Sequence, residues 1–118
     1  MASKDMEQRK NESERIRQKY PDRVPVICER APRSNLPEIE KKKFLVPGTM
    51  LCGEFKYIIQ KHINQAEPGS IFSDQTIYLF VNNRTSLKTG DELSESYETY
   101  KSDDGFLYMV YTAEDTLG

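Results

Sequence analysis

Two short apolar runs most constrain the fold of this chain, because both are rich in β-branched and aromatic residues. The run at residues 76–81 predicts a central strand that is buried on both faces, and the run at residues 106–112 predicts a second strong strand. Two weaker strands are expected earlier, at residues 24–30 and 41–47. Each contains a proline, which belongs near a strand start or at a sheet edge because it cannot donate to the hydrogen-bond ladder.

An amphipathic helix is expected between the second and third strands. The apolar residues of this segment recur at helical spacing and would pack on the sheet; they are Leu51, Phe55, Ile58, Ile59 and Ile63. Gly53 near its start weakens the helix slightly. A mostly polar helix is expected at residues 11–19, after a frayed or weakly helical start, and Ile16 and Tyr20 would share one of its faces. Thr89 and Glu92 have the spacing of a capping box for a short helix at about residues 90–99.

The order of these elements is helix, strand, strand, helix, strand, helix, strand. Two early strands, a helix that crosses the sheet and a late strand predict an α+β fold with the main helix on one face. The chain has 118 residues, which is typical of one domain.

Composition argues against several classes of function. The polar start of the chain shows no signal peptide, and no apolar run has the length of a membrane span. Cys28 and Cys52 lack the spacing of metal ligands and are expected reduced in an intracellular compartment, with a disulfide between them as the alternative. His62 is the one histidine, no phosphate-binding glycine loop is present, and no metal site, cofactor or enzymatic activity is expected.

The charge is unevenly distributed along the chain. Residues 1–61 carry 14 basic and nine acidic residues, whereas residues 62–118 carry three basic and ten acidic ones. A basic half can steer acidic partners to one surface, although an ordinary solvated surface would have the same counts. The basic run at residues 41–43 is weak evidence for nucleic-acid binding, because it is short, the chain is acidic overall and no row of aromatic residues accompanies the run.

Four separate motifs, in this order, resemble those of the ubiquitin-like autophagy modifiers, the GABARAP-like family. They are Tyr20-Pro-Asp-Arg-Val-Pro-Val-Ile27, Lys41-Lys-Lys-Phe-Leu-Val-Pro47, Phe80-Val-Asn-Asn83 and Asp104-Gly-Phe-Leu-Tyr-Met-Val-Tyr111. The resemblance covers about Asn11 to Gly118. It implies a ubiquitin-like β-grasp with a four-stranded mixed sheet. An N-terminal helical extension at residues 1–22, a core at residues 23–112 and a flexible conjugation tail at residues 113–118 are expected.

The resemblance also implies a role for Gly118. A glycine has no Cβ, so its carboxylate can pass through a narrow enzyme channel. By analogy with the family, E1-like and E2-like enzymes would activate Gly118 and join it to phosphatidylethanolamine on autophagic membranes. A cysteine protease would expose the glycine or later release the lipid; whether this sequence is a processed form or needs no trimming stays open. The expected location is the cytoplasm, and the autophagosome membrane after lipidation.

The second function implied by the family is binding of cargo receptors through short motifs of the form aromatic-x-x-aliphatic. An exposed edge strand at residues 43–46 would let such a peptide add as another strand, with its two anchors on opposite faces. The expected aromatic pocket comprises Ile16, Pro25, Lys43, Leu45 and Phe106. The expected aliphatic pocket comprises Phe44, Val46, Pro47, Met50, Phe55 and Ile58. The expected basic rim for acidic flanking residues comprises Arg23, Lys41 and Lys42.

Some positions depart from the family pattern. Met6 stands where an aromatic residue is common, so a loose first helix is expected, and residues 64–75 are longer than the usual connection. Leu51 stands where a polar helix cap is usual, and His62 stands where an arginine often contacts peptides. Three alternatives stay open: a non-covalent adaptor of the same fold, a cytoskeleton-binding protein using the basic N-terminus, and purely structural core contacts for Phe44, Val46, Phe55 and Ile58.

Overall fold

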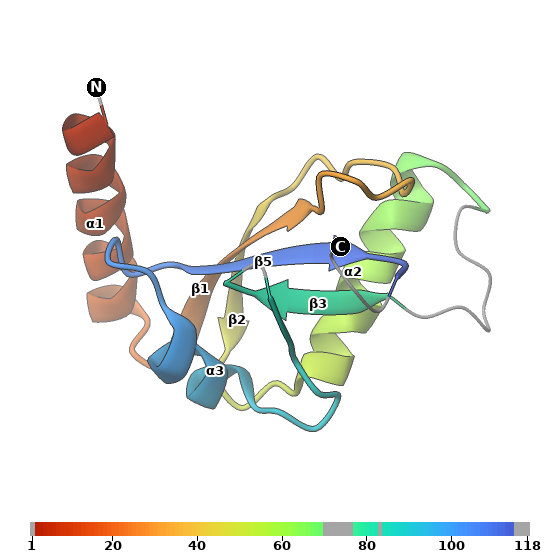
Figure 1. Ribbon diagram of the computed structural model, residues 1–118. Helices are drawn as coiled ribbons and strands as arrows, with labels where there is room; N and C mark the ends of the chain where they lie inside the picture. Colours follow the sequence, from red (N-terminus) through yellow and green to blue (C-terminus); the bar gives the residue numbers. More distant parts are fainter. Residues whose placement is uncertain (1, 70–76, 83, 115–118) are drawn as a thin grey trace.

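The computed structural model describes residues 2–69, 77–82 and 84–114, which form a mixed five-stranded sheet and three helices (Figure 1). The elements are α1 (Ala2–Lys19), β1 (Arg23–Arg30), β2 (Lys43–Pro47), α2 (Cys52–Ala66), β3 (Tyr78–Val81), β4 (Thr85–Ser86), α3 (Leu93–Tyr100) and β5 (Leu107–Thr112). The predicted elements are found in the predicted order, with the short strand β4 added between β3 and α3 and with α2 three residues longer at its C-terminal end than expected.

The strands lie in the order β2-β1-β5-β3-β4. β1 pairs antiparallel with β2 and parallel with β5, and β5 pairs antiparallel with β3. The middle strand of the sheet is therefore β5. β3 lies inside the sheet, between β5 and β4, and three of its four residues are buried, so the predicted interior strand is confirmed over Tyr78–Val81. The expected four strands become five because β4, which pairs with Val81 and Phe80, is two residues long and has no readable period.

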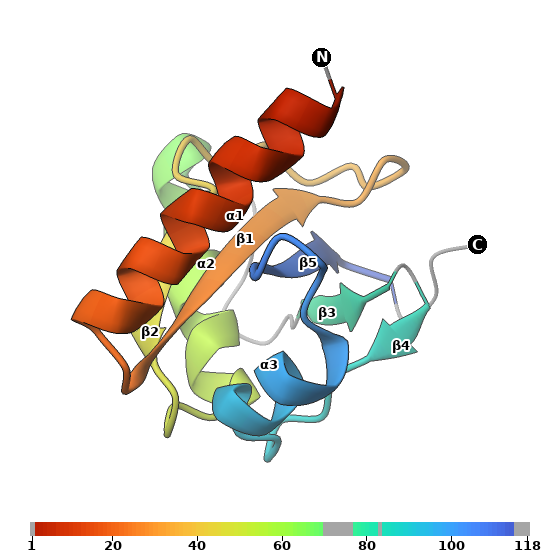
Figure 2. The same cartoon turned by 90° about the vertical axis from the view of Figure 1, so that its left-hand side faces the viewer.

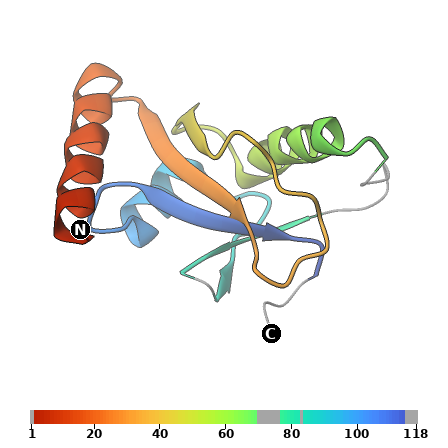
Figure 3. The same ribbon diagram turned by 90° about the horizontal axis from the view of Figure 1, so that it is seen from above.

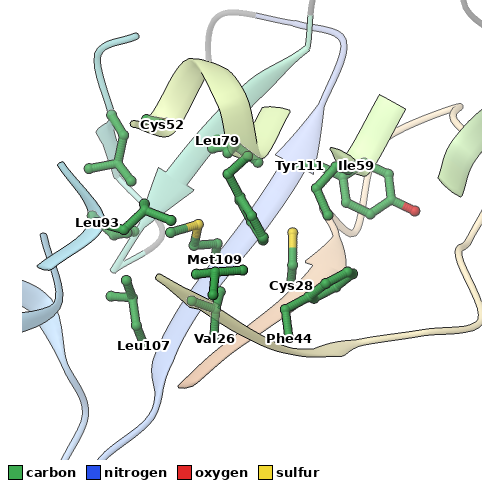
Figure 4. Packing of buried hydrophobic residues seen from close by; sticks show 14 of the residues in the cluster. Val26, Cys28, Phe44, Cys52, Ile59, Leu79, Leu93, Leu107, Met109 and Tyr111 are labelled. Carbon is green, nitrogen blue, oxygen red and sulfur yellow. The ribbon is translucent and has the colours of Figure 1, made fainter. Parts of the chain in front are cut away.

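The hydrophobic core lies between the sheet and α2. α2 buries Cys52, Phe55, Ile59 and Ile63 at spacings of three and four residues, as expected of an amphipathic helix. Alternate residues of the strands meet this face, and Figure 4 shows Val26, Cys28, Leu79, Leu107, Met109 and Tyr111 packed below α2. Burial raises the pKa of both free cysteine thiols, to about 11 for Cys52, so both behave as core residues.

The start of α2 is capped without a polar N-cap side chain. Glu54 reaches back to accept a hydrogen bond from the Leu51 N–H at 3.0 Å. The next two N–H groups donate to backbone carbonyls of the segment before α3: Cys52 to Asp91 at 2.8 Å and Gly53 to Thr89 at 2.9 Å. A Cβ on Gly53 would lie 2.4 Å from Thr89 Cγ2, so the glycine that weakens the helix locally is what permits this close approach.

α3 begins later than predicted. Its N-cap is Glu92, whose side chain makes no capping hydrogen bond, so the capping box proposed for Thr89 and Glu92 was wrong. The carbonyl of Thr89 instead accepts from α2, and the N–H groups of Leu93 and Ser94 donate to Met50 and Gly48 carbonyls at 2.9 Å. Tertiary partners therefore replace the local cap.

α1 is one continuous helix from Ala2, so the expectation of a frayed or loose start was wrong. Figures 2 and 3 show that it lies across β1 on the side of the sheet away from α2. Most of its side chains are exposed, and its attachment depends on a cluster of four residues, here called the Asp104 cluster: Arg9, Ser13, Asp104 and Tyr108.

The carboxylate of Asp104 is the centre of this cluster and is 1% exposed. It accepts hydrogen bonds from Arg9 Nε at 2.9 Å, from the Phe106 N–H at 3.0 Å and from the Tyr108 hydroxyl. Burial alone would raise the pKa of Asp104, but these hydrogen bonds outweigh it and lower the pKa below its usual range. Burial, together with the hydrogen bond to Asp104, raises the pKa of Tyr108 to about 12.

The turn before β5 is shaped to let α1 approach. Gly105 has a φ of +88°, and a Cβ there would lie 2.2 Å from the Ser13 Oγ. Tyr97 donates from its hydroxyl to the Gly105 carbonyl at 2.6 Å and holds the turn from the side of α3. Only a glycine satisfies both the backbone angle and the contact with the helix.

Candidate functional site

β2 is an edge strand, as expected. One side of β2 pairs with β1, and the order of strands leaves the other side without a partner among the described residues. Its side chains alternate: Phe44 and Val46 are buried towards α2, while Lys43 and Leu45 are more exposed. An unpaired ladder of this kind accepts an extended peptide through main-chain hydrogen bonds.

The residues of the predicted aromatic pocket come from α1, β1, β2 and the residue before β5. Pro25 of β1 is directly opposite Leu45 of β2 in the register. Pro25 and Phe106 are buried, whereas Ile16 and Leu45 are half-buried and present part of their surface to solvent. The Lys43 Nζ lies 5.9 Å from the centroid of the Phe106 ring, so the lysine covers this apolar surface.

An ion pair that the sequence reasoning missed fastens this lysine to α1. Glu12 accepts from the Lys43 Nζ with both carboxylate oxygens, at 3.0 and 3.1 Å. Glu12 lies one helical turn before Ile16, so both side chains are on the same face of α1. The pair is largely exposed, and water screens it. Lys43 can therefore leave Phe106 at little cost in free energy.

The residues of the predicted aliphatic pocket form two layers. Phe55 is fully buried, and its ring contacts the Phe44 ring edge-to-face at 5.4 Å between centroids. Phe44 also meets the ring of His62 at 5.4 Å, which places the histidine at the rim. Phe44 and Val46 are buried as well, whereas Pro47, Met50 and Ile58 reach the surface. The buried residues are the floor of this region, and the surface residues are the part that a ligand can touch.

Met50 and Ile58 also line a hollow of about 560 Å³ at the start of α2. The other residues around it are Leu51, Gly53, Glu54, Tyr57 and Thr89. Leu51 is 38% exposed and Tyr57 is 60% exposed, and both are among the three large apolar side chains exposed in the described part of the chain. This hollow continues the aliphatic region around the N-terminus of α2.

The predicted basic rim is divided between the two ends of β2. Arg23 is paired with Pro47 in the register and lies 6.0 Å from the Tyr20 ring, at the C-terminal end of β2. Lys41 and Lys42 precede the strand at its other end, and the Lys41 Nζ lies 5.1 Å from the Phe44 ring. The structure therefore separates Arg23 from the two lysines.

The lysine end of β2 opens into a second hollow of about 560 Å³, between α1 and the sheet. Met6, the residue expected to loosen the first helix, lines it together with Arg9 of α1 and with Lys42 and Lys43 at the start of β2. Three basic side chains converge here, although Asp104 and Glu29 also face the hollow. Arg9 is engaged with Asp104, so Lys42 is the cation with more freedom to meet an acidic ligand residue.

Two negative findings apply to residues 2–69, 77–82 and 84–114. No helix in this part of the chain is both long and apolar enough to cross a bilayer. Histidine, cysteine and acidic side chains do not gather there in groups of three or more that could bind a metal ion. Gly118, the predicted conjugation residue, lies outside the described residues, as does most of the expected tail.

Comparison with known proteins identifies the family. The family described as "Autophagy protein Atg8 ubiquitin like" matches residues 8–118. Autophagy-related protein 8 of Dictyostelium discoideum is 48% identical over 113 residues, which cover 96% of this chain and 88% of the relative. Autophagy-related protein 8e of Arabidopsis thaliana is 46% identical over 114 residues, 97% of this chain and 88% of the relative.

Two solved structures show the same fold. Plasmodium falciparum Atg8, in complex with a peptide of Plasmodium falciparum Atg3, has 56% sequence identity and a TM-score of 0.79, covering 92% of this chain and 90% of that one. Trypanosoma brucei ATG8 has 32% identity and a TM-score of 0.82, covering 96% of this chain and 91% of that one. The mixed sheet with α2 on one face is thus a ubiquitin-like fold, and the chain belongs to the Atg8 family of ubiquitin-like autophagy proteins.

Proposed function

We propose that this chain is a modifier that is joined through Gly118 to phosphatidylethanolamine on autophagic membranes and recruits receptors carrying aromatic-x-x-aliphatic motifs. The observation that carries the recruiting half is the unpaired edge of β2 between two apolar regions, one on each face of the sheet. The complex of Plasmodium falciparum Atg8 with an Atg3 peptide supports peptide binding in the family.

The arrangement of the two regions sets the direction of the peptide. The aromatic pocket centres on Lys43 and Leu45, and the aliphatic region centres on Pro47, Met50 and Ile58, beyond the end of β2. A peptide strand rises about 3.3 Å per residue, so its aromatic and aliphatic residues stand about 10 Å apart. The aromatic residue therefore lies near the start of β2 and the aliphatic residue near its end. This peptide runs parallel to β2, and acidic residues before its motif meet Lys41 and Lys42.

The conjugating half of the proposal rests on family membership and on the path of the chain. The match to the family extends to residue 118 and includes the terminal glycine. β5 ends at Thr112, and the chain beyond it has no helix or strand through Glu114. E1-like and E2-like enzymes would act on Gly118 and a cysteine protease would reverse the reaction, so the protein would alternate between cytoplasm and autophagosome membrane. Two acyl chains are sufficient for stable attachment to a membrane.

Reconstitution tests the conjugating half. The protein is incubated with the E1-like and E2-like enzymes, ATP and liposomes containing phosphatidylethanolamine, and its mass is measured. An increase of one phospholipid is expected for the unchanged chain, and little or none for Gly118→Ala. An adduct that forms equally well on Gly118→Ala would rule this chemistry out.

Peptide titration tests the recruiting half. An acidic peptide carrying Trp-x-x-Leu should bind the unchanged protein and lose most of its affinity for Leu45→Asp, because a charge would be buried beside the indole. Leu45→Asn is the matched control, since it removes apolar surface without adding charge. Undiminished affinity in a folded Leu45→Asp protein would show that β2 is not the binding edge. Peptide binding without any conjugate would favour the non-covalent adaptor.

A further inference from the structure

Leu51 is an apolar residue in a position that normally carries a polar one. It is the N-cap of α2, where a serine, threonine or aspartate side chain would bond a free N–H group of the first turn. The nearby donors already have partners, since Glu54 accepts from the Leu51 N–H and the carbonyls of Asp91 and Thr89 accept from the next two residues. The helix start therefore does not need a hydrogen bond from the side chain at position 51, and the Leu51 side chain is 38% exposed.

A second exposed apolar side chain lies beside it. Tyr57 is 60% exposed, and the Lys61 Nζ lies over its ring, 4.9 Å from the ring centroid. Leu51 and Tyr57 line the same hollow of about 560 Å³, whose lining is chiefly apolar and whose one charged residue, Glu54, is engaged with the Leu51 backbone. A hollow of this size and character fits an apolar side chain of a ligand.

The hollow is continuous with the aliphatic region of the proposed peptide site. Met50 and Ile58 belong to both. A peptide that runs parallel to β2 leaves the strand at Pro47 and continues towards Met50 and Leu51. The peptide residues that follow the aliphatic residue of the motif therefore lie next to the hollow.

We infer that the hollow formed by Leu51, Tyr57 and their neighbours is a third subsite, which binds an apolar residue located a few positions after the aliphatic residue of a receptor motif. This inference rests on the proposed peptide binding and adds a specificity rule to it. Receptors with an apolar residue downstream of the motif bind more tightly than receptors that end there or continue with polar residues.

Three peptides test the inference. The first is an acidic peptide with Trp-x-x-Leu that ends just after the leucine. The second extends it by six residues that include one leucine, whose position is scanned, and the third has serine in place of that leucine. Calorimetric titration should give about tenfold tighter binding for the best leucine extension than for the serine extension, because partial burial of a leucine side chain has roughly this effect.

Two variants locate the effect. Leu51→Asn restores a polar N-cap, so it should fold at least as well as the unchanged protein, and Tyr57→Ser alters an exposed ring. Each should reduce the gain from the leucine extension to about threefold or less and leave the affinity for the short peptide unchanged. Tyr20→Ser is the matched control, because Tyr20 is the third exposed large apolar residue and lies outside the hollow.

The outcomes separate the two proposals. If the short peptide fails to bind, the proposed peptide site itself is wrong. If it binds and the leucine extension gives no gain over the serine extension, the third subsite is refuted alone. A gain that survives both Leu51→Asn and Tyr57→Ser, or that disappears in Tyr20→Ser, also overturns the inference, because the extension then binds elsewhere.

Discussion

Replacing Asp104 by asparagine would test whether one buried carboxylate fastens α1 to the rest of the protein. Asparagine keeps the shape of the side chain but has one acceptor oxygen instead of two. If that oxygen keeps the Phe106 N–H, the amide nitrogen faces the donors of Arg9 and Tyr108. At least one side of the Asp104 cluster is then lost, and α1 should loosen while the sheet remains folded.

The size of the effect follows from the hydrogen bonds that change. A bond to a charged group contributes about 1.5–3 kcal/mol and a neutral bond about 0.5–1.5 kcal/mol. The Phe106 N–H then donates to a neutral oxygen, and the Tyr108 hydroxyl accepts from the asparagine amide instead of donating, so these two bonds lose about 1 kcal/mol each, or about 2 kcal/mol together. Arg9 is left out of this sum because its side chain is 39% exposed and water screens the ion pair.

Urea unfolding at pH 7 measures this loss, and amide hydrogen exchange shows where it falls. The neighbouring Asp103 is exposed, so Asp103→Asn is a control that changes the same charge and should alter the free energy of unfolding by less than about 0.5 kcal/mol. Exchange should accelerate chiefly in α1 for Asp104→Asn. Equal stability and equal exchange of α1 in the two variants would refute the reasoning.

The effect also depends on pH in a defined direction. The pKa of Asp104 is lower in the folded protein than in the unfolded chain, where a carboxyl group titrates near about 3.9. The stabilisation is then fully present above that value and disappears as the pH falls through the folded pKa. The difference in stability between the unchanged protein and Asp104→Asn should be constant from neutral pH to about pH 5 and should shrink below about pH 4.

Three shorter predictions concern the turn, the thiols and the basic rim. Gly105→Ala should lower the free energy of unfolding by about 2 kcal/mol, because a positive φ and a contact with α1 both oppose a Cβ; unchanged urea unfolding would contradict this. Cys28 and Cys52 should react with a thiol reagent only at the rate of unfolding, since both are buried and their pKa values are raised, and fast labelling of the native protein would exclude that burial. Charge reversal of Lys41 and Lys42 together should weaken an acidic motif peptide about fivefold in low salt and less in high salt. A salt-independent change would indicate lost packing instead.

Much of the fold could be predicted because periodicity and composition agreed with tertiary structure. The spacing of Phe55, Ile59 and Ile63 identified α2, and the apolar run at residues 106–112 identified β5. β4 could not be predicted, because two residues have no period and its pairing with β3 comes from the turn that precedes it. The start of α3 was predicted too early because Thr89 and Glu92 have the spacing of a capping box. In the structure the Thr89 carbonyl instead accepts a hydrogen bond from the Gly53 N–H of α2, a long-range contact that the local sequence does not reveal.

The candidate site could be predicted in outline only through its resemblance to a family. The sequence pattern of an apolar strand residue such as Phe44 is the same whether the residue packs in the core or lines a binding pocket. In the structure Phe44 is buried and belongs mainly to the core. The ion pair between Glu12 and Lys43 joins residues 31 positions apart, which no local pattern can reveal. For the hollow at Leu51, the sequence showed only that an apolar residue stands where a polar helix cap is usual.

The parallel pairing of β1 with β5 has a consequence for how the molecule is assembled. β5 is the last of the described strands and the only one of them that pairs with both β1 and β3. Until it is synthesised, β1–β2 and β3–β4 are separate hairpin-like pairs with no shared hydrogen bonds, and neither can complete the core under α2. Cooperative folding therefore waits until β5 has been synthesised, and a nascent chain stopped before Leu107 should remain sensitive to proteases.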